Sequence, residues 1–289
     1  MKKRIAFVSV LVIGLCLYFY PSKKYDYELA ICAIFKDEAP WLKEWVTYHH
    51  EILGVEHFYL YNNDSSDNYE EVLSPFMKKG IVELFSWSSN DPSHQNLEKV
   101  DPSDAPFYKF QIGAYNDCLR KKALGKAKWV AIIDIDEFIF AKEGKKAFYH
   151  LLKKCERKNK NSLKLSWRIF GTSDIKELTP DELLTEKMVY RAKDSYYWHN
   201  WFKCIHRPEA ISFCHIHDAI PKNTQDVPRH ADPKKFCINH YWTRSENFCE
   251  KKRKQTKKTH PEFFQDLKEV KDESLKPFIP KLKKALNKL

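Results

Sequence analysis

Residues 129–140 read WVAIIDIDEFIF, an apolar run of strand length that ends in acids. Asp134, Asp136 and Glu137 fall within the last seven residues of this stretch. Burying a charge is costly unless the charge is paired or bound to a metal. Because strand side chains alternate with a period of two, we expect Asp134 and Asp136 to face one ligand from the same side. The stretch therefore predicts a buried strand with a ligand-binding end.

The segments before this stretch alternate between strand and helix patterns. LAICAIF at 29–35, HFYLYN at 57–62 and IVELFSW at 81–87 are apolar runs of strand length. Residues 41–53, 68–79 and 107–123 instead carry apolar side chains at helical spacing. This alternation predicts an α/β fold with a mainly parallel sheet flanked by helices, which binds ligands beyond the carboxyl ends of its strands.

Beyond residue 160 the helical alternation fades. SLKLSW, KCIH, EAISFCHIH and FCINHYW predict shorter strands in a smaller mixed β region, and the chain from about 244 to 289 is Lys-rich and predicted to be helical. No repeat or long linker divides the sequence. We therefore expect a single domain over residues 25–289 with a basic, helical C-terminus.

The N-terminus predicts a membrane anchor. Residues 5–20, IAFVSVLVIGLCLYFY, follow three basic residues and are slightly shorter than the roughly 20 apolar residues that a span prefers. No small-residue cleavage site follows, so residues 1–24 are predicted to be an uncleaved single-pass anchor, with a signal peptide as the alternative. Lys23 and Lys24 lie beyond the run and leave its orientation open.

The composition narrows the class of partner. The chain has 289 residues, a formal net charge of +11 and 43% hydrophobic residues, which exclude wholesale disorder. Its positive charge favours anionic partners such as nucleotide phosphates, nucleic acid or an acidic membrane surface. Charge alone does not choose among these partners.

Oxygen-rich ends of strands suit hard cations. Mg²⁺ and Mn²⁺ prefer oxygen ligands, and Mg²⁺ is usually bound by one or two carboxylates together with substrate phosphates. Asp134 and Asp136 are therefore explained if a metal and a diphosphate share the site. An isolated pair of this spacing is more often a helix cap with solvated acids, so the interpretation depends on the rest of the sequence.

Six stretches, in chain order, resemble glycosyltransferase family 92 and the related family-2-like transferases of the GT-A fold. They are CAIFKDEAPWLKEWVTYHHEILGVEHFYLYNNDSSD, QIGAYNDCLRK, WVAIIDIDEFIF, WRIFGTSD, KCIHRPE and NHYWTRSENFCEKK, within roughly residues 28–255. The resemblance implies a GT-A-like catalytic domain with Mn²⁺ or Mg²⁺ as cofactor. It further implies inverting transfer of a hexose from a UDP-sugar, UDP-galactose being one option, to a hydroxyl of a glycan or glycolipid.

The same resemblance implies the residues of the site. It assigns Asp134, Asp136 and His240 to the metal, with Asp134 also supporting the ribose or a metal-bound water. Glu137 matches the motif as well, although a cap on the next turn explains it equally well. The implied donor contacts are Lys36, Asp37, Glu38, Asn63, Asp64, Ser65, Asp67, Gln111, Asn116 and Asp134.

Two parts of the predicted site depart from the family pattern or lack a motif. Relatives usually read D-N-x-S-x-D where this chain has Asn62 in place of the first acid, and Asp64 is a candidate substitute. An inverting transfer needs a carboxylate that takes the proton of the acceptor. Asp218 and Asp174 are the candidates in the second half, and neither lies in a matching motif.

Other classes of function and other roles stay open at this stage. The run KKRKQTKK at 251–258 would suit nucleic acid, but a solvated or membrane-facing basic helix explains it better, and no nucleic-acid partner is expected. An inactive, membrane-anchored binding module is a further alternative. Trp198, Trp201 and Trp242 are candidates to stack on a sugar, although tryptophans are more often buried in a core.

Overall fold

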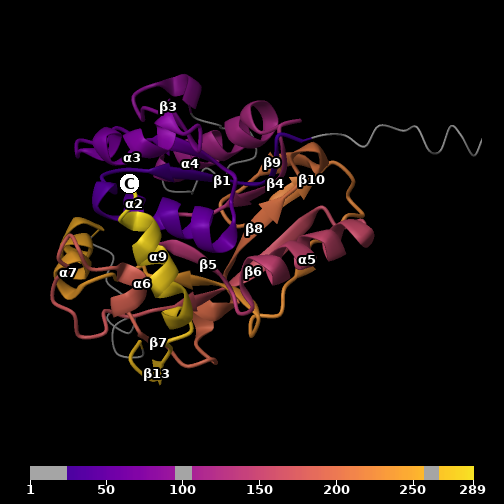
Figure 1. The fold of residues 1–289 in the computed structure, drawn as a ribbon. Coiled ribbons are helices and arrows are strands. Elements are labelled where there is room, and N and C mark those ends of the chain that lie inside the picture. Colours follow the sequence, from indigo (N-terminus) through magenta and orange to yellow (C-terminus); the bar gives the residue numbers. More distant parts are fainter. Residues whose placement is uncertain (1–24, 95–105, 257–266) are drawn as a thin grey trace, which may run out of the picture.

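The computed structural model describes residues 25–94, 106–256 and 267–289 (Figure 1). A nine-stranded sheet crosses the molecule in the order β3-β2-β1-β4-β8-β6-β12-β5, and β11 pairs with β6. The bounds of these strands are β1 Tyr27–Phe35, β2 His57–Asn62, β3 Val82–Ser86, β4 Ala127–Ile132, β5 Glu137–Ala141, β6 Ser162–Ile169, β8 Phe202–His206, β11 Arg229–His230 and β12 Phe236–His240.

The first half of the chain builds the parallel part of the sheet. β1 pairs in parallel with both β2 and β4, and β2 pairs in parallel with β3. The connections carry the helices α2 Ala39–Thr47, α3 Tyr69–Lys78 and α4 Pro106–Asp117. Residues Tyr48–Leu53 and Cys118–Lys122 extend α2 and α4 as π-helical turns. The predicted β-α-β-α-β-α-β order is confirmed.

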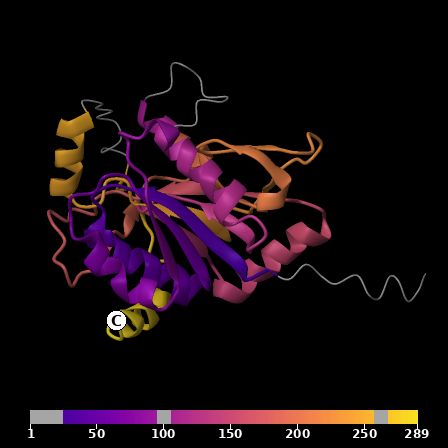
Figure 2. The ribbon, with the colours of Figure 1, turned by 90° about the horizontal axis from the view of Figure 1, so that it is seen from above.

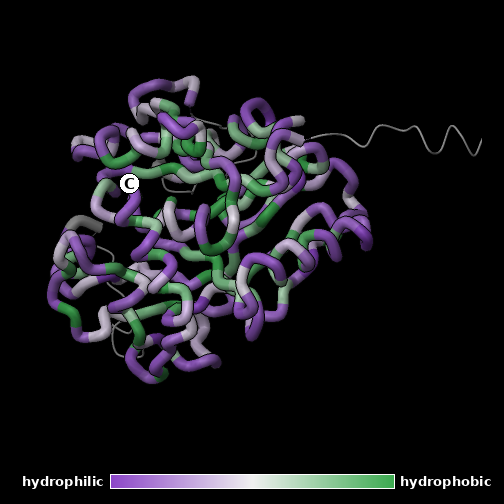
Figure 3. The backbone as a smooth tube through the Cα atoms, in the orientation of Figure 1, coloured by the Kyte–Doolittle hydropathy of each residue, from purple (hydrophilic) through white to green (hydrophobic). Residues whose placement is uncertain are grey.

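Helices cover both faces of the sheet because the strand side chains alternate. Leu29, Ile31 and Ala33 of β1 pack into the core that α2, α3 and the C-terminal helix α9 Ile279–Leu286 cover. Ala30 and Cys32 point to the other face, which α4 covers. Figure 2 shows α4 on one side of the sheet and the indigo and yellow helices on the other. Apolar segments accordingly concentrate along the strands, and hydrophilic ones along the outer turns (Figure 3).

The second half of the chain completes the sheet with mixed pairing. β8 runs antiparallel between β4 and β6, whereas β12 is parallel to β6 and antiparallel to β5. Two small sheets lie apart, one formed by β9 Ile211–Cys214 with β10 Ala219–Pro221, the other by β7 Tyr190–Arg191 with β13 Val270–Lys271. The remaining helices are α5 Gly144–Arg157, α6 Leu184–Lys187 and α7 Glu246–Thr256. The predicted mixed β region and C-terminal helices are confirmed, but Val270–Lys271, within the stretch predicted to be helical, forms strand β13.

The predicted membrane anchor is corrected. Among the residues that the structure describes, no helix is long and apolar enough to cross a membrane. Helix α5, for example, has 14 residues, whereas a span needs about 20 apolar ones. The run at 5–20 lies outside the described residues, and the prediction of a single-pass anchor over residues 1–24 is not supported.

Candidate active site

The three acids of the opening stretch lie where β4 gives way to β5. β4 ends at Ile132, a turn carries Asp134 and Asp136, and Glu137 begins β5. The two aspartates are therefore placed by a turn rather than by strand alternation, which corrects the expected reason for their orientation. The turn is held by two hydrogen bonds between Asp134 and Glu137, each using the backbone N–H of one residue. All three acids are thus brought to one edge of the sheet.

Asp134 is enclosed by three donors from two other elements. Its Oδ1 accepts hydrogen bonds from Gln111 Nε2 at 3.0 Å and from Tyr115 OH at 2.9 Å, both on α4. Its Oδ2 lies 2.8 Å from Nζ of Lys203 on β8, whose side chain is fully buried. The carboxylate of Asp134 is therefore already satisfied by protein groups.

The ionisation of these acids follows from their neighbours. Burial raises the pKa of Asp134, but the charge of Lys203 and the hydrogen bonds outweigh burial and lower the pKa. Burial raises the pKa of Glu137 to about 7, because its carboxylate has few compensating partners and one buried oxygen, Oε1, has no hydrogen bond. At neutral pH Asp134 is ionised, while Glu137 is partly protonated.

Asp136 faces three basic side chains. Its Oδ1 is 3.5 Å from Nε2 of His240, the last residue of β12, and its Oδ2 is 3.7 Å from Nζ of Lys252 on α7. The Tyr241 backbone N–H also bonds to the Asp136 carbonyl at 2.8 Å, which fixes β12 to the turn. Burial raises the pKa of Asp136, but His240, Lys252 and Arg244 outweigh burial and hold the pKa well below its usual range.

The donor atoms near Asp136 determine whether a metal ion fits this site. Within the described ranges no group of three or more His, Cys, Asp or Glu side chains is placed to hold a metal. The ligand set of Asp134, Asp136 and His240 stays a prediction. Lys203 occupies the position beside Asp134 that a cation would need. Asp136 and His240 remain compatible with a shared metal ion, because two metal–ligand bonds of about 2.1 Å each can span the 3.5 Å between Asp136 Oδ1 and His240 Nε2. The His240 Nδ1 is buried without a hydrogen bond.

Arg244 adds a buried cation next to Asp136. Its guanidinium lies between the rings of Trp41 and Phe248, at 4.9 and 4.4 Å from their centroids, and its Nη2 is 2.6 Å from Oε2 of Glu38. Burial raises the pKa of Glu38, although Arg244 works against that shift. Among the described residues, Nε and Nη1 of Arg244 have no hydrogen-bond partner. Arg244 and Lys252 therefore make the rim near Asp136 positive.

The predicted donor-contacting turns after β1 and β2 meet at the same edge of the sheet. The Asp37 backbone N–H donates to Ser65 Oγ at 2.9 Å, and Asp37 Oδ1 accepts from the Ser66 backbone at 2.7 Å. Asp67 Oδ2 accepts from the Ala39 backbone N–H at 2.7 Å and so caps α2. Because the carboxyl ends of parallel strands share one edge, these reciprocal bonds join segments 28 residues apart.

Other predicted donor residues have separate structural partners. Asp64 Oδ2 accepts from both the backbone and the hydroxyl of Ser89 at 2.8 Å, and these bonds lower the pKa of Asp64. Asn63 Nδ2 donates to the Trp87 carbonyl at 2.8 Å, while Lys36 is exposed. Asn116 does not join the acidic group, because its amide bonds to the backbones of Ile112 and Cys214 inside the core.

Both candidates for the base are paired with lysines. Asp218 Oδ2 lies 2.6 Å from Lys164 Nζ, and Asp218 Oδ1 accepts from the Ala219 backbone at 2.8 Å. Asp174 is paired with Lys268 and is largely exposed. Within the described residues neither acid contacts Asp134 or Asp136, so the structure brings neither of them into the acidic group.

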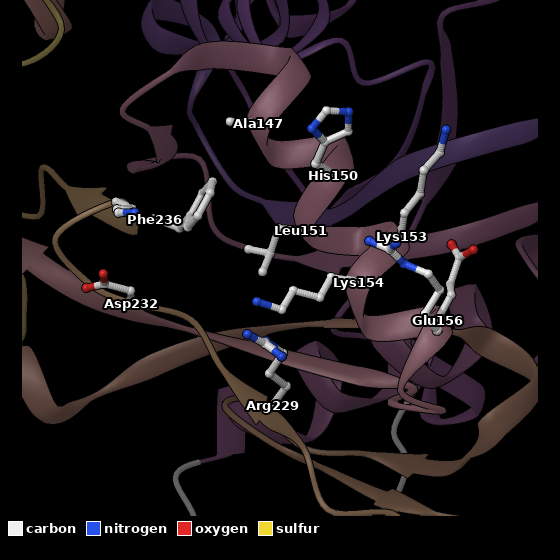
Figure 4. A pocket seen from close by; sticks show the side chains of 11 residues that line it. Ala147, His150, Leu151, Lys153, Lys154, Glu156, Arg229, Asp232 and Phe236 are labelled. Carbon is white, nitrogen blue, oxygen red and sulfur yellow. The ribbon is translucent and has the colours of Figure 1, made fainter.

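A separate cavity of about 900 Å³ lies away from the acids. It opens between α5 and the segment around β11, and Figure 4 shows Lys154 and Arg229 extending beside Leu151, with Phe236 opposite them and Lys153 turned away. None of the predicted site residues lines this cavity. It contributes to the basic surface but is distinct from the candidate active site.

Sequence reasoning missed four residues of the site: Tyr115, Lys203, Arg244 and Lys252. Tyr115 had a local signal, because it stands four residues after Gln111 and therefore on the same face of α4. Lys203 and Arg244 lie within the quoted stretches KCIH and NHYWTRSENFCEKK but were not singled out. Their role depends on which strands become neighbours.

The geometry defines an α/β protein with an acidic, cation-rimmed site at the carboxyl edge of its sheet. The sequence pattern of glycosyltransferase family 92 matches residues 25–285, and the chain belongs to that family. This membership confirms the family that the motifs predicted and supports the prediction of a transferase. The sheet with helices on both faces is the GT-A-like architecture that the resemblance implied.

Curated relatives include a glycosyltransferase family 92 protein of Ricinus communis, 27% identical over 74% of this chain and 35% of its own length. A galactan beta-1,4-galactosyltransferase of Arabidopsis thaliana is 28% identical over 41% of this chain and 21% of its own length. The chain therefore spans about a third or less of the length of these relatives.

Solved structures of similar shape include S. aureus TarS 1-349 in complex with UDP-GlcNAc, with a TM-score of 0.42 and 12% identity, covering 76% of this chain and 60% of that one. A mannosyltransferase of Pyrobaculum calidifontis in complex with GDP-Man and Mn²⁺ has a TM-score of 0.36 and 13% identity, covering 71% and 55%. At these TM-scores neither the donor nor the metal carries over to this chain.

Proposed function

We propose that this chain transfers a hexose from a UDP-sugar, with UDP-galactose the first donor to test, to a hydroxyl of a glycan or glycolipid with inversion. Membership of family 92 supports the reaction class, and the galactan galactosyltransferase among its relatives supports the choice of donor. The observation that carries the proposal is the approach of Asp136 and His240 to 3.5 Å at the carboxyl edge of the sheet.

The charges around Asp136 suit a nucleoside diphosphate. Lys252 and Arg244 place two cations beside Asp136, and Arg244 is 1% exposed with two N–H-bearing nitrogens unpaired. A cation in a site of low dielectric stabilises developing negative charge more strongly than it does in water. These side chains would orient the diphosphate and stabilise the charge that it gains as it leaves.

Asp136 and His240 would hold the divalent ion. When bound, Mn²⁺ or Mg²⁺ supplies positive charge that neutralises the diphosphate oxygens. Asp134 takes a different part, because Lys203, Gln111 and Tyr115 already occupy its oxygens. It would fix the turn and the shape of the donor site instead of contacting the ion.

The deciding experiment measures hydrolysis of UDP-galactose, UDP-glucose and UDP-N-acetylglucosamine by the full chain with Mn²⁺, Mg²⁺ or EDTA. We expect hydrolysis of one donor that needs a divalent ion and that Asp136→Asn abolishes. Asp194→Asn is the matched control, since Asp194 is an exposed acid paired with Arg191. Binding of RNA without hydrolysis of any UDP-sugar would overturn the proposal in favour of a nucleic-acid-binding protein.

A further inference from the structure

Four aromatic rings form a continuous group beside the acids, named here the aromatic platform: Trp167, Trp198, Trp201 and His217. The rings of Trp198 and Trp201 are 6.0 Å apart with planes 23° apart, and those of Trp167 and Trp201 are 6.3 Å apart with planes 26° apart. The ring of His217 meets Trp201 at 4.8 Å and Trp167 at 5.3 Å, edge to face. The indole planes of Trp167 and Trp198 are therefore each nearly parallel to the plane of Trp201.

The backbone fixes the platform in place. Trp167 belongs to β6, and its N–H donates to the Trp201 carbonyl at 2.8 Å. The turn Tyr197–Asn200 carries Trp198, and His199 of that turn accepts the Ile169 N–H at 3.0 Å. Because β6 belongs to the central sheet, the rings are held before any ligand arrives. Binding then costs little side-chain entropy.

One end of the platform reaches the candidate site. The ring of Trp167 lies 4.5 Å from that of His240, which faces Asp136. His217 Nδ1 donates to the carbonyl of Phe202 at 3.1 Å, next in the chain to Lys203. The platform therefore begins where the proposed donor site ends.

The other end of the platform is open to solvent. Trp201 is 37% exposed and the neighbouring Tyr197 is 67% exposed, although aromatic side chains of this size are mostly buried. Exposed aromatic groups with neighbouring polar groups mark binding sites more often than chance exposure does. A hexopyranose presents a face of C–H groups that packs on an indole, and its hydroxyls stay in water at the rim.

We propose that the aromatic platform is the acceptor site and that it binds an oligosaccharide of neutral hexopyranoses by stacking on Trp201 and Trp198. This inference rests on the proposed function. The exposed indole edge at Trp201 suits a sugar ring, and the contact of Trp167 with His240 directs the end of the acceptor toward the acids. A phosphorylated acceptor would find no cationic partner among the rings of the platform.

The test measures binding by the full chain of β-1,4-linked tetrasaccharides of galactose, glucose and mannose, with and without UDP and Mn²⁺. Isothermal titration calorimetry gives the affinities for the wild type and for Trp201→Ala, Trp201→Phe, the double variant Trp198→Ala/Trp201→Ala, and Leu124→Ala. Leu124 is the matched control, because it is an apolar side chain of similar exposure, 42%, in the turn before β4. Affinity for UDP is measured on the same samples.

We expect at least one tetrasaccharide to bind, and Trp201→Ala to weaken that binding about tenfold. Trp201→Phe should retain most of the affinity and Leu124→Ala all of it, with affinity for UDP unchanged in each. The platform is not the acceptor site if the wild type binds UDP but no tetrasaccharide. The same conclusion follows if the double variant Trp198→Ala/Trp201→Ala binds the tetrasaccharide as tightly as the wild type does. In both cases the proposed function still stands. If the wild type binds no UDP, the proposed function fails, and the assignment of an acceptor site fails with it.

Discussion

Nζ of Lys203 lies 2.8 Å from Oδ2 of Asp134, and the side chain of Lys203 is fully buried. Burial lowers the pKa of Lys203, but Asp134 and Glu137 outweigh burial and raise the pKa above its usual value, so the amine is charged. The ammonium group of Lys203 thus neutralises Asp134, the first of the two aspartates in the turn. The two aspartates, two residues apart in sequence, are therefore given different tasks by their neighbours.

The buried pair predicts a large coupling energy. Lys203→Met should destabilise the fold by about 2–3 kcal/mol, because Asp134 keeps only the uncharged donors Gln111 and Tyr115 and water screens part of its charge. Urea unfolding measures the change.

Asp134→Asn combined with Lys203→Met is the control for that pair. The double variant should recover much of the lost stability, since no unpaired charge remains. Additive losses in the double-mutant cycle would show that the two groups do not depend on each other.

Asp136→Asn should remove the effect of metal on UDP affinity. We expect Mn²⁺ to tighten UDP binding in the wild type and to have no effect in the variant, because the amide is a weaker ligand than the carboxylate that faces His240. Titration calorimetry with and without EDTA measures both affinities. A variant that keeps the full response to Mn²⁺ would place the ion elsewhere.

His49 predicts a loss of stability in acid. Its Nδ1 lies 2.9 Å from the Trp45 carbonyl and must donate, so Nε2 accepts the Ile139 N–H at 3.2 Å. Burial lowers the pKa of His49 to about 3 from 6.5, so the unfolded chain takes up the proton first. The contribution of neutral His49 to the free energy of unfolding is fully present above pH 6.5, and it is lost as the pH falls toward 3.

Urea unfolding at pH 7.5 and 5.0 tests this dependence. The wild type should lose about 2 kcal/mol more than His49→Gln between these pH values, because a shift of one pKa unit corresponds to about 1.4 kcal/mol. Comparing the two proteins removes the contribution of the other histidines. Equal losses in both would mean that His49 is protonated in the fold without cost.

Asp67 predicts a capping effect between segments. Asp67→Ala should lower stability by about 1 kcal/mol, because the Ala39 N–H at the start of α2 loses its acceptor. Asp67→Asn keeps an acceptor oxygen and should lose less. Thermal unfolding measures both, and identical melting temperatures for the wild type and Asp67→Ala would show that the cap is not needed.

Local sequence patterns were enough to predict the helices and strands and the position of the acids. Apolar runs such as 29–35 and helical spacing such as 41–53 follow from local periodicity, which survives in the sequence whatever the neighbours are. The quoted motifs predicted the family and drew attention to Asp136 and His240. Even Gln111 was found, because it lies in a motif on a helix beside the acids.

Only the tertiary structure decided which charges meet. Lys203 reaches Asp134 across 69 residues of chain because β8 pairs antiparallel with β4, and His240 reaches Asp136 because β12 pairs with β5. Asn116 turned inward instead, to bond with Cys214 across 98 residues. Strand order is set by the packing of the whole core, and local periodicity carries no record of it. The sequence therefore predicted Trp198 and Trp201 as candidates to stack on a sugar, but neither the pairing of Lys203 with Asp134 nor the grouping of the rings with Trp167 and His217.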